Sequence, residues 1–235
     1  MSIDYSILED RLGYKFRNRQ GLVEALTHPS FAYEQNLETV DNQRLEFLGD
    51  AVLQLIVTEY LFAAIPEAPE GAMTKIRAGL VCEETLTRLA LTLELGGYLR
   101  LGHGETLSGG AANPSNLSDA MEAVLGAIYL DGGMERARQV MTGLLDPYFE
   151  PAIGGSLTYD YKSRLFEWAQ AGQDREIKFL VETTSGPEHD RHYQVGLYLN
   201  DRLQVTGEGR TKKAAEQDAS RQFLETMIGE EQTRC

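Results

Sequence analysis

Residues 42–53 of the chain are NQRLEFLGDAVL, and residues 118–130 are SDAMEAVLGAIYL. Each stretch is apolar enough to predict a core helix, yet each carries two acids on one face, because residues three or four apart share a face. The four acids are Glu46, Asp50, Asp119 and Glu122. An acid close to an apolar core is costly unless it is paired or holds a cation. Because Mg²⁺ takes oxygen ligands, the two stretches predict a shared metal site.

Solvated acids are the alternative explanation, and for either pair alone that alternative stays open. Basic partners are scarce: Arg44 lies near the first pair, and no Lys or Arg lies between Arg100 and Arg136 around the second. The similar order of acids and apolar residues in both stretches favours the cation. Gly49 costs a helix about 1 kcal/mol relative to Ala. We expect it to serve either a close backbone approach beside the acids or ordinary helix packing.

The bulk composition is that of a soluble globular protein. The 235 residues suffice for one large or two modest domains, and 42% of them are hydrophobic and 25% charged. Charges interrupt the apolar stretches before about 18 residues, so we expect no membrane-spanning helix. The N-terminus lacks a basic start followed by an apolar block, so no secretory signal is expected. Cys82 and Cys235 form no disulfide framework, which favours a reducing cytoplasm, and the scattered histidines predict no zinc site.

The charge is unevenly distributed along the chain. A net charge of −14 argues against broad, non-specific attraction to nucleic acid. Residues 1–155 hold 11 Lys and Arg against 22 Asp and Glu, a net −11, whereas residues 156–235 hold 11 against 14, a net −3. Any contact with nucleic acid is therefore expected in the second half, and it must be local.

The chain divides into a helical part and a mixed part. Residues 1–150 show helical periodicity and no strand pattern, which predicts an all-α domain. A flexible linker is expected at 151–158, a small α+β domain of order α-β-β-β-α at 159–228, and a tail at 229–235. Helices are expected at 5–12, 20–26, 42–64, 72–91, 117–130 and 134–145, with a glycine-rich loop at 102–116. In the second part, helices are expected at 161–171 and 211–227, and strands at 177–184, 193–199 and 203–208.

A strand-to-helix junction occupies residues 207–216, GEGRTKKAAE. Its glycines free the backbone, and Lys212 and Lys213 stand at the start of the helix. Backbone N–H groups, the positive end of the helix dipole and the two lysines together suit a phosphate. A solvated cationic helix start is the alternative at this point.

This junction, the helix DYKSRLFEWAQ (160–170) and the segment GPEHDRHYQV (186–195) together resemble the double-stranded RNA-binding domain over its full length. In that family the first helix and the loop between the first two strands touch minor grooves, and the second helix meets phosphates across the major groove. The resemblance implies phosphate contacts for Lys212 and Lys213, minor-groove contacts for Pro187 and His189, and a 2′-hydroxyl contact for Glu167. The neighbouring acids, which should weaken binding, are Glu188, Asp190, Glu208 and Glu216.

The first quoted stretch resembles the signature of the ribonuclease III family. The segments GAMTKIRAGLV (71–81) and GGAANPSNLSDAMEAVLGAIYLDGG (109–133) and the RNA-binding module follow in that family's order. The resemblance implies an endonuclease that cuts both strands of duplex RNA. The products would carry 5′-phosphates and 3′-hydroxyls with short 3′ overhangs, and the expected targets are ribosomal RNA precursors and structured transcripts.

The resemblance also implies roles for the acids. Glu46, Asp119 and Glu122 would be direct metal ligands, and Asp50 a ligand or a holder of metal-bound water. The implied cofactor is Mg²⁺, with Mn²⁺ as a substitute, and no nucleotide cofactor is expected. Two ions held by carboxylates can supply what phosphodiester hydrolysis needs.

A two-fold homodimer is implied as well, because one site per chain must cut both strands. The ring of Phe47 would insert into the partner subunit, with core packing as the alternative. Gln43 stands where the family usually has Glu, and Glu70 is its acidic counterpart across the valley between subunits. The loop 109–116 lacks the basic residues often found there, and no membrane partner is expected.

Two other functions remain to be weighed. A non-catalytic, duplex-RNA-binding dimer would use the helical domain only to dimerise, but the intact set of four acids disfavours it. An acidic scaffold that binds proteins would explain the charge, but it leaves the Lys212-Lys213 pair and the α-β-β-β-α order unexplained.

Overall fold

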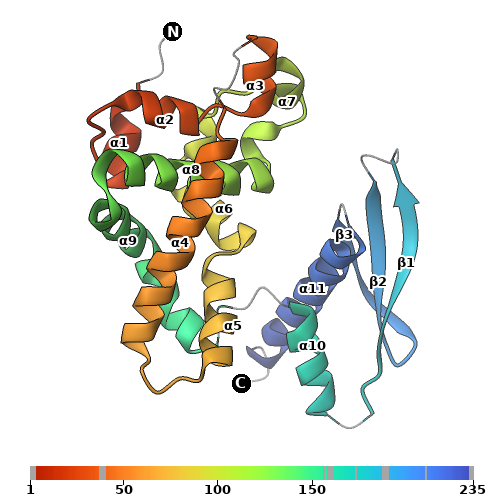
Figure 1. Cartoon of the computed structure of the whole chain (residues 1–235). Coiled ribbons are helices and arrows are strands. Elements are labelled where there is room, and N and C mark those ends of the chain that lie inside the picture. Colours follow the sequence, from red (N-terminus) through yellow and green to blue (C-terminus); the bar gives the residue numbers. More distant parts are fainter. Residues whose placement is uncertain are drawn as a thin grey trace. The chain divides into compact units, whose positions relative to one another are not determined.

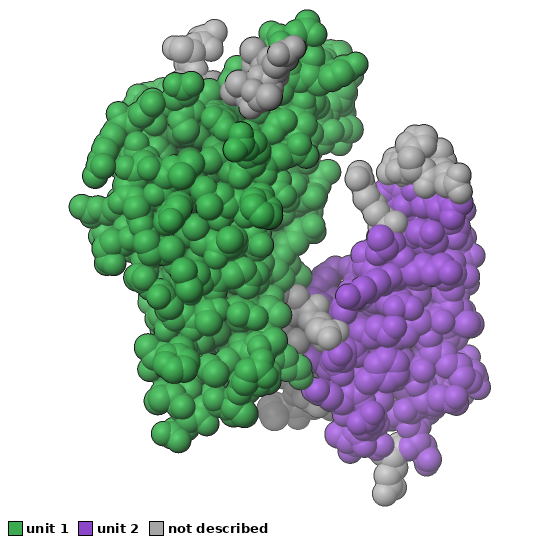
Figure 2. Space-filling model, viewed as in Figure 1, with its two compact units in different colours: residues 1–157 green, residues 158–235 purple. Residues whose placement is uncertain are grey.

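The computed structural model describes residues 4–36, 41–155, 157, 161–172, 174–186, 191–209 and 211–232. The chain divides into two compact units, Met1–Leu157 and Thr158–Cys235 (Figure 2). Each unit has its own hydrophobic core. The expected fold class, an all-α domain followed by a small α+β domain, is confirmed.

The first unit is helical, and its described residues hold no strand beyond an isolated bridge between Thr27 and Arg100. Its elements are α1 (Ser6–Leu12), α2 (Arg19–Ala25), α3 (Pro29–Glu34), α4 (Gln43–Ala64), α5 (Glu70–Leu80), α6 (Glu83–Thr92), η1 (Leu95–Tyr98), α7 (His103–Leu107), η2 (Gly110–Ala112), α8 (Pro114–Gly132) and α9 (Met134–Ile153). α8 crosses α4 in the middle of the unit (Figure 1).

Apolar residues at helical spacing explain why α4 and α8 lie in the core. Leu53 and Ile56 of α4 are fully buried, as are Val124 and Ile128 of α8. Burial of an aliphatic side chain of this size stabilises a fold by about 1.5–3 kcal/mol. The two helices that carry the four acids are therefore anchored in the hydrophobic core of the unit.

The two helices begin with different caps. Asn113 Oδ1 accepts a hydrogen bond from Ser115 N–H at 3.0 Å and so caps α8. Asn42 precedes α4 as expected, but its side chain makes no capping hydrogen bond. Asp41 supplies a contact there instead, because its Oδ1 accepts from Gln43 N–H at 3.1 Å.

The single helix expected over residues 72–91 is wrong, because the chain forms α5 and α6 with a break between them. No Gly or Pro marks the break at residues 81–82. It is held by the buried Thr85, whose Oγ1 donates to Gly79 O at 2.7 Å. A side-chain contact therefore stabilises the break.

Other boundaries also differ from expectation. The expected loop 102–116 contains α7 and η2, and α8 begins inside it. Asn116 holds these turns together, since its amide donates to Glu105 Oε1 at 2.7 Å and to Gly110 O at 3.1 Å. α9 extends to Ile153, so helix occupies the first residues of the expected linker 151–158.

By length and hydropathy alone, α4 could cross a membrane, because an 18-residue window within it has a mean hydropathy of 1.5. This corrects the expectation that charges interrupt every apolar stretch before that length. In the structure α4 packs on α8, and the core helix of a soluble protein passes the same test.

The second unit is a three-stranded antiparallel sheet with two helices on one face (Figure 1). Its elements are α10 (Tyr161–Gln170), β1 (Ile177–Ser185), β2 (His192–Leu199), β3 (Arg202–Gly209) and α11 (Lys212–Gln232). The strands lie in the order β1-β2-β3. The core includes Leu165 and Leu197, and the rings of Trp168 and Phe223 meet edge to face at 5.3 Å.

Candidate active site and nucleic-acid interface

Two glycines set the distance between the helices that carry the acids. A Cβ added at Gly49 of α4 would lie 2.6 Å from the carbonyl carbon of Glu122 and 3.1 Å from the amide nitrogen of Gly126 on α8. The two backbones therefore meet with no side chain between them, and of the two roles considered for Gly49 the structure supports close approach. Glu46 and Asp50, on either side of Gly49 in the sequence, consequently lie beside Glu122.

Glu122 shows the effect of this crowding. Burial raises the pKa of the Glu122 carboxyl, and the charges of Asp50, Glu46 and Asp119 raise it further, to about 8. Without a cation, the site therefore favours the protonated form of Glu122 at neutral pH. A positive charge placed among the four acids would remove that repulsion.

Glu46 and Asp119 have raised pKa values for related reasons. Burial is the main cause for Glu46, and the charges of Asp119, Asp41 and Asp50 add to it. For Asp119, burial outweighs the lowering effects of a neighbouring hydroxyl and of the positive charge of His28. The structure thus brings the four predicted acids into electrostatic range of one another.

Protein partners for the four acids are few. Asp50 accepts a hydrogen bond from the Gln54 amide at 3.3 Å, and Asp119 accepts a long one from Ser118 at 3.5 Å. In the described parts of the chain, none of the four takes part in an ion pair. The charge of this cluster is therefore left without a compensating lysine or arginine.

The acids do not form a ready-made metal site. Among the residues that the structure describes, no three Asp, Glu, His or Cys side chains stand close enough together to hold an ion. Like-charged carboxylates repel one another when no cation lies between them. The donors nevertheless suit a hard cation in kind, since carboxylate oxygens select Mg²⁺ or Mn²⁺, and Mg²⁺ keeps several waters and needs few protein ligands.

Two neighbours of the acids were not predicted as site residues. Asp41 lies just before α4, and its charge raises the pKa of Glu46 after the larger effect of burial. His28 precedes α3 and lies within electrostatic range of Asp119. The spacing of residues in the sequence does not indicate that His28 lies near Asp119, because the two residues are far apart in the chain and meet only in the folded unit.

The residues predicted to support a dimer lie on the surface. Phe47 is 82% exposed on α4, so core packing within one chain is wrong for it. Gln43 is exposed at the start of the same helix, and Glu70 is exposed at the start of α5, where its Oε1 accepts from Thr74 Oγ1 at 2.8 Å. Glu70 also lines a hollow of about 170 Å³ between α4 and α5. The other residues that line it are Thr58, Leu61, Phe62, Met73, Thr74 and Arg77.

The second unit presents the predicted lysines at the start of α11. Thr211 caps this helix through its Oγ1, which accepts from Ala214 N–H at 3.1 Å, and Lys212 and Lys213 follow it, both exposed. Glu167 is exposed on α10. The remaining predicted contacts, Pro187 and His189, lie outside the described residues.

One of the acids expected to weaken this phosphate site has a partner of opposite charge in the structure. Glu216 forms an ion pair with Lys162, with 2.6 Å between Oε2 and Nζ. β3 also approaches α11 closely, because a Cβ at Gly209 would lie 2.6 Å from Ala215 N. The absence of a side chain at Gly209 therefore lets β3 pack closely against the first turn of α11, in addition to the backbone freedom that glycine provides.

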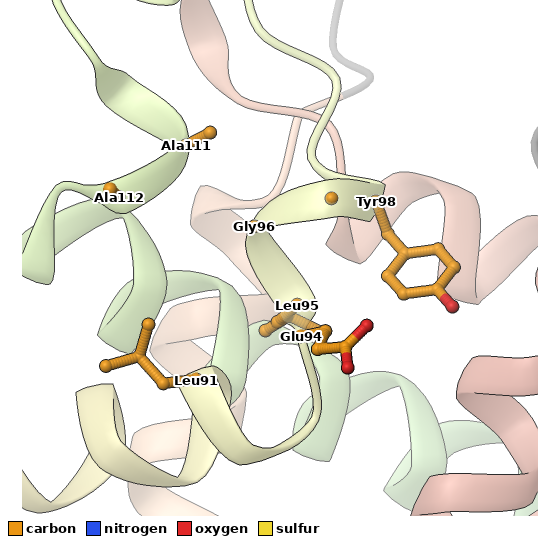
Figure 3. A pocket seen from close by; sticks show the side chains of 8 residues that line it. Leu91, Glu94, Leu95, Gly96, Tyr98, Ala111 and Ala112 are labelled. Atoms are coloured by element: carbon orange, nitrogen blue, oxygen red, sulfur yellow. The ribbon is translucent and has the colours of Figure 1, made fainter.

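A separate hollow of about 600 Å³ lies between α6, η1 and η2 (Figure 3). Leu91, Leu95, Ala111 and other mainly apolar groups line it, with Glu94 as its single carboxylate. None of the four acids contributes to it. This hollow therefore does not belong to the candidate active site.

Comparison with known proteins decides the family. The model of the ribonuclease-III-like family matches residues 18–147, and the double-stranded RNA binding motif matches residues 161–227. The chain belongs to the ribonuclease III family. The matched ribonuclease III region contains α4 and α8 with all four acids, and the matched RNA-binding motif contains Lys212 and Lys213.

Similar proteins cover nearly the whole chain. Ribonuclease 3 of Carboxydothermus hydrogenoformans is 42% identical over 96% of this chain and 96% of its own length. Ribonuclease 3 of Caldanaerobacter subterraneus is 41% identical over 94% of this chain and 96% of its own length. Among solved structures, the nuclease domain of ribonuclease III from Campylobacter jejuni is 41% identical, with a TM-score of 0.59, and covers 63% of this chain and 99% of that one. The ribonuclease III resemblance found in the sequence is thereby confirmed.

Proposed function

We infer that this chain is a double-strand-specific endoribonuclease that hydrolyses phosphodiesters on both strands of duplex RNA. The observation that carries this inference is the set of four acids that Gly49 and Gly126 bring together at the α4–α8 crossing. Family membership and the RNA-binding motif of the second unit agree with it. Ribosomal RNA precursors and structured transcripts in the cytoplasm are the targets we propose.

We propose Mg²⁺ as the cofactor, with Mn²⁺ as a substitute. Glu46, Asp119 and Glu122 would hold the metal directly, and Asp50 would hold it directly or through water. When bound, the metal would neutralise charge on the phosphate and activate a water for attack. The burial and mutual repulsion of the four acids support this proposal, because both raise the free energy of the ionised, metal-free site.

The protein's own part is to position the carboxylate oxygens of the four acids and, in the described residues, to leave them unpaired with lysine or arginine. Close contact at Gly49 and Gly126 fixes the distance between the two acid-bearing helix faces. Because no lysine or arginine pairs with the acids in the described parts of the chain, the metal has no internal competitor. The acids would also repel the RNA backbone until a metal is bound, so metal-free protein should bind duplex RNA poorly at this site.

A two-fold homodimer is the assembly we propose. Phe47 is exposed on α4, with Leu55 and Phe62 exposed further along the same helix. The hollow beside Glu70, at about 170 Å³, has room for one aromatic ring, because a cavity of about 150 Å³ holds benzene. In a two-fold interface the same patch meets itself, so Phe47 of each subunit can enter the hollow of the other. Each subunit would then place its four acids against one RNA strand.

The test is cleavage of a long, perfect RNA duplex. We expect cleavage in Mg²⁺, none with chelator, and a loss of about 100-fold or more for Glu122→Gln, since removal of even an outer-shell partner of a metal ligand costs about 10–100-fold. The Glu94→Gln variant, which changes an acid of the separate hollow, serves as the matched control and should cut at the parent's rate. A Glu122→Gln variant as active as the parent would refute the site assignment.

The alternative is a dimer that binds duplex RNA without cutting it. It predicts binding to the duplex in Ca²⁺ or without metal, and no cleavage in either Mg²⁺ or Mn²⁺. Gel-shift and cleavage assays on the same RNA therefore separate the two functions.

A further inference from the structure

His28 is a polar residue beside the acids that the proposed chemistry leaves unused. Backbone hydrogen bonds fix its place: His28 N–H donates to Arg100 O at 3.0 Å, and the preceding Thr27 O accepts from Asn42 N–H at 2.9 Å. Asn42 O in turn accepts from Glu46 N–H at 2.8 Å. Thr27 and Glu46 therefore bond to the same residue, which holds His28 at the end of α4 that carries the acids.

The imidazole ring is held in one orientation by Ser30. Nδ1 of His28 lies 2.7 Å from Ser30 Oγ and accepts from Ser30 N–H at 3.2 Å. Ser30 Oγ itself accepts from Gly102 N–H at 2.9 Å, so its own hydrogen is available to Nδ1. Because Nδ1 is an acceptor, the neutral ring carries its hydrogen on Nε2.

The other ring nitrogen has no protein partner in the part of the chain that the structure describes. No hydrogen bond to Nε2 is formed there, and the side chain is partly exposed. Asp119 lies within electrostatic range of His28, but the two side chains are not hydrogen-bonded. A donor of fixed direction therefore stands free beside the acidic site.

We propose that His28 is an RNA-contacting residue, whose Nε2–H donates a hydrogen bond to a backbone oxygen of the strand beside the bond that is cut. The oxygen belongs to a phosphate or to a 2′-hydroxyl. This inference rests on the proposed function. Acids repel the RNA backbone, so a fixed donor at their edge supplies an attraction that orients the strand without reading its bases.

Two substitutions separate this contact from the ring's structural role. Asparagine is a good helix cap whose side-chain oxygen can replace Nδ1 toward Ser30, but it lacks a donor at the position of Nε2. Glutamine is longer and can place an amide N–H near that position. His103→Asn, an exposed histidine of the same unit, is the matched control.

The measurement is kcat/KM for duplex RNA in Mg²⁺, with thermal unfolding of each variant. We expect His28→Asn to lower kcat/KM about tenfold, the effect of losing one hydrogen bond, with an unchanged unfolding temperature. We expect His28→Gln to recover most of the loss and His103→Asn to match the parent. The proposal is overturned if His28→Asn cuts as fast as the parent, or if the asparagine and glutamine variants are equally impaired.

An RNA with single 2′-deoxy substitutions beside the cut identifies the acceptor. If the effect of His28→Asn disappears on this RNA, the acceptor is the 2′-hydroxyl, and if the effect persists, the acceptor is a phosphate oxygen. Should the parent itself fail to cut, the proposed function is wrong. In that case the affinity of the parent and of His28→Asn for the RNA duplex is compared in Ca²⁺. Weaker binding by His28→Asn supports the inference, and equal affinities overturn it.

Discussion

Substitution of Gly49 by alanine tests how the two acid-bearing helices are held. Alanine should stabilise an isolated helix by about 1 kcal/mol relative to glycine. In the folded unit, however, the new Cβ would meet the backbone of α8, at 2.6 Å from the carbonyl carbon of Glu122 and 3.1 Å from Gly126 N. Backbone atoms cannot rotate away, so the cost falls at the upper end of the usual overpacking range of about 1–3 kcal/mol. We expect Gly49→Ala to lower the free energy of unfolding by about 2 kcal/mol in total.

The assay is thermal or urea unfolding at a fixed protein concentration. For a unit of this size, about 2 kcal/mol corresponds to a fall of roughly 4–8 °C in Tm. Gly143→Ala is the matched control, because Gly143 lies within α9 and a Cβ there would meet nothing within 4 Å. It should be neutral or stabilising by up to about 1 kcal/mol.

Activity should respond to the same change. Alanine at Gly49 would force α4 away from α8, and a displacement of about 1 Å among catalytic groups can cost about 100-fold in rate. We therefore expect Gly49→Ala to lose cleavage even where it remains folded. A variant that is as stable and as active as the parent would show that the helices are not in backbone contact, and the account of the site would fail.

Three further predictions follow from particular contacts. Burial would raise the pKa of Asp131, but hydrogen bonds, including one from Tyr14 Oη at 2.6 Å, hold it below its ordinary value. The ionised Asp131 carboxylate therefore contributes to the free energy of unfolding above about pH 4, and this contribution is lost as the pH falls through the lowered pKa. In urea unfolding, Asp131→Asn should lower the free energy of unfolding by about 1–2 kcal/mol at pH 7 and by less near pH 3. Replacing Lys212 and Lys213 by Gln should weaken duplex binding and reduce the slope of log K against log salt concentration, measured by titration, by about 2. An unchanged slope would show that neither lysine contacts the RNA. Phe47→Ala should convert the dimer to monomers in sedimentation experiments, and a variant that stays dimeric would contradict the proposed role of the ring.

The central elements of the fold followed from the sequence because their signals are local. Apolar residues at helical spacing predict α4 and α8, and the acids within them mark the site. Turn residues and alternating strands likewise predict the β-sheet of the second unit, where Asn200 and Asp201 adopt the left-handed backbone of a tight turn, with φ of 51° and 60°. Each of these signals lies within a few residues of the feature that it predicts.

The parts that the sequence did not predict depend on individual side-chain and backbone contacts. The break between α5 and α6 has no Gly or Pro, and it is held by the side chain of Thr85 on Gly79 O. His28 lies within electrostatic range of Asp119, far from it in the sequence, and backbone contacts of Thr27 and His28 with Arg100 and of Thr27 with Asn42 fix its place. Neither contact leaves a periodic pattern, so neither could be read from residue spacing.

Sequencing of the ends of products from a perfect RNA duplex, cut in Mg²⁺, tests the central claim most directly. Two acidic sites related by a two-fold axis must cut the two strands at a fixed offset. The account predicts 5′-phosphate and 3′-hydroxyl ends with 3′ overhangs of one short length. Blunt ends, overhangs of variable length, or cuts confined to one strand would contradict a paired site built from Glu46, Asp50, Asp119 and Glu122.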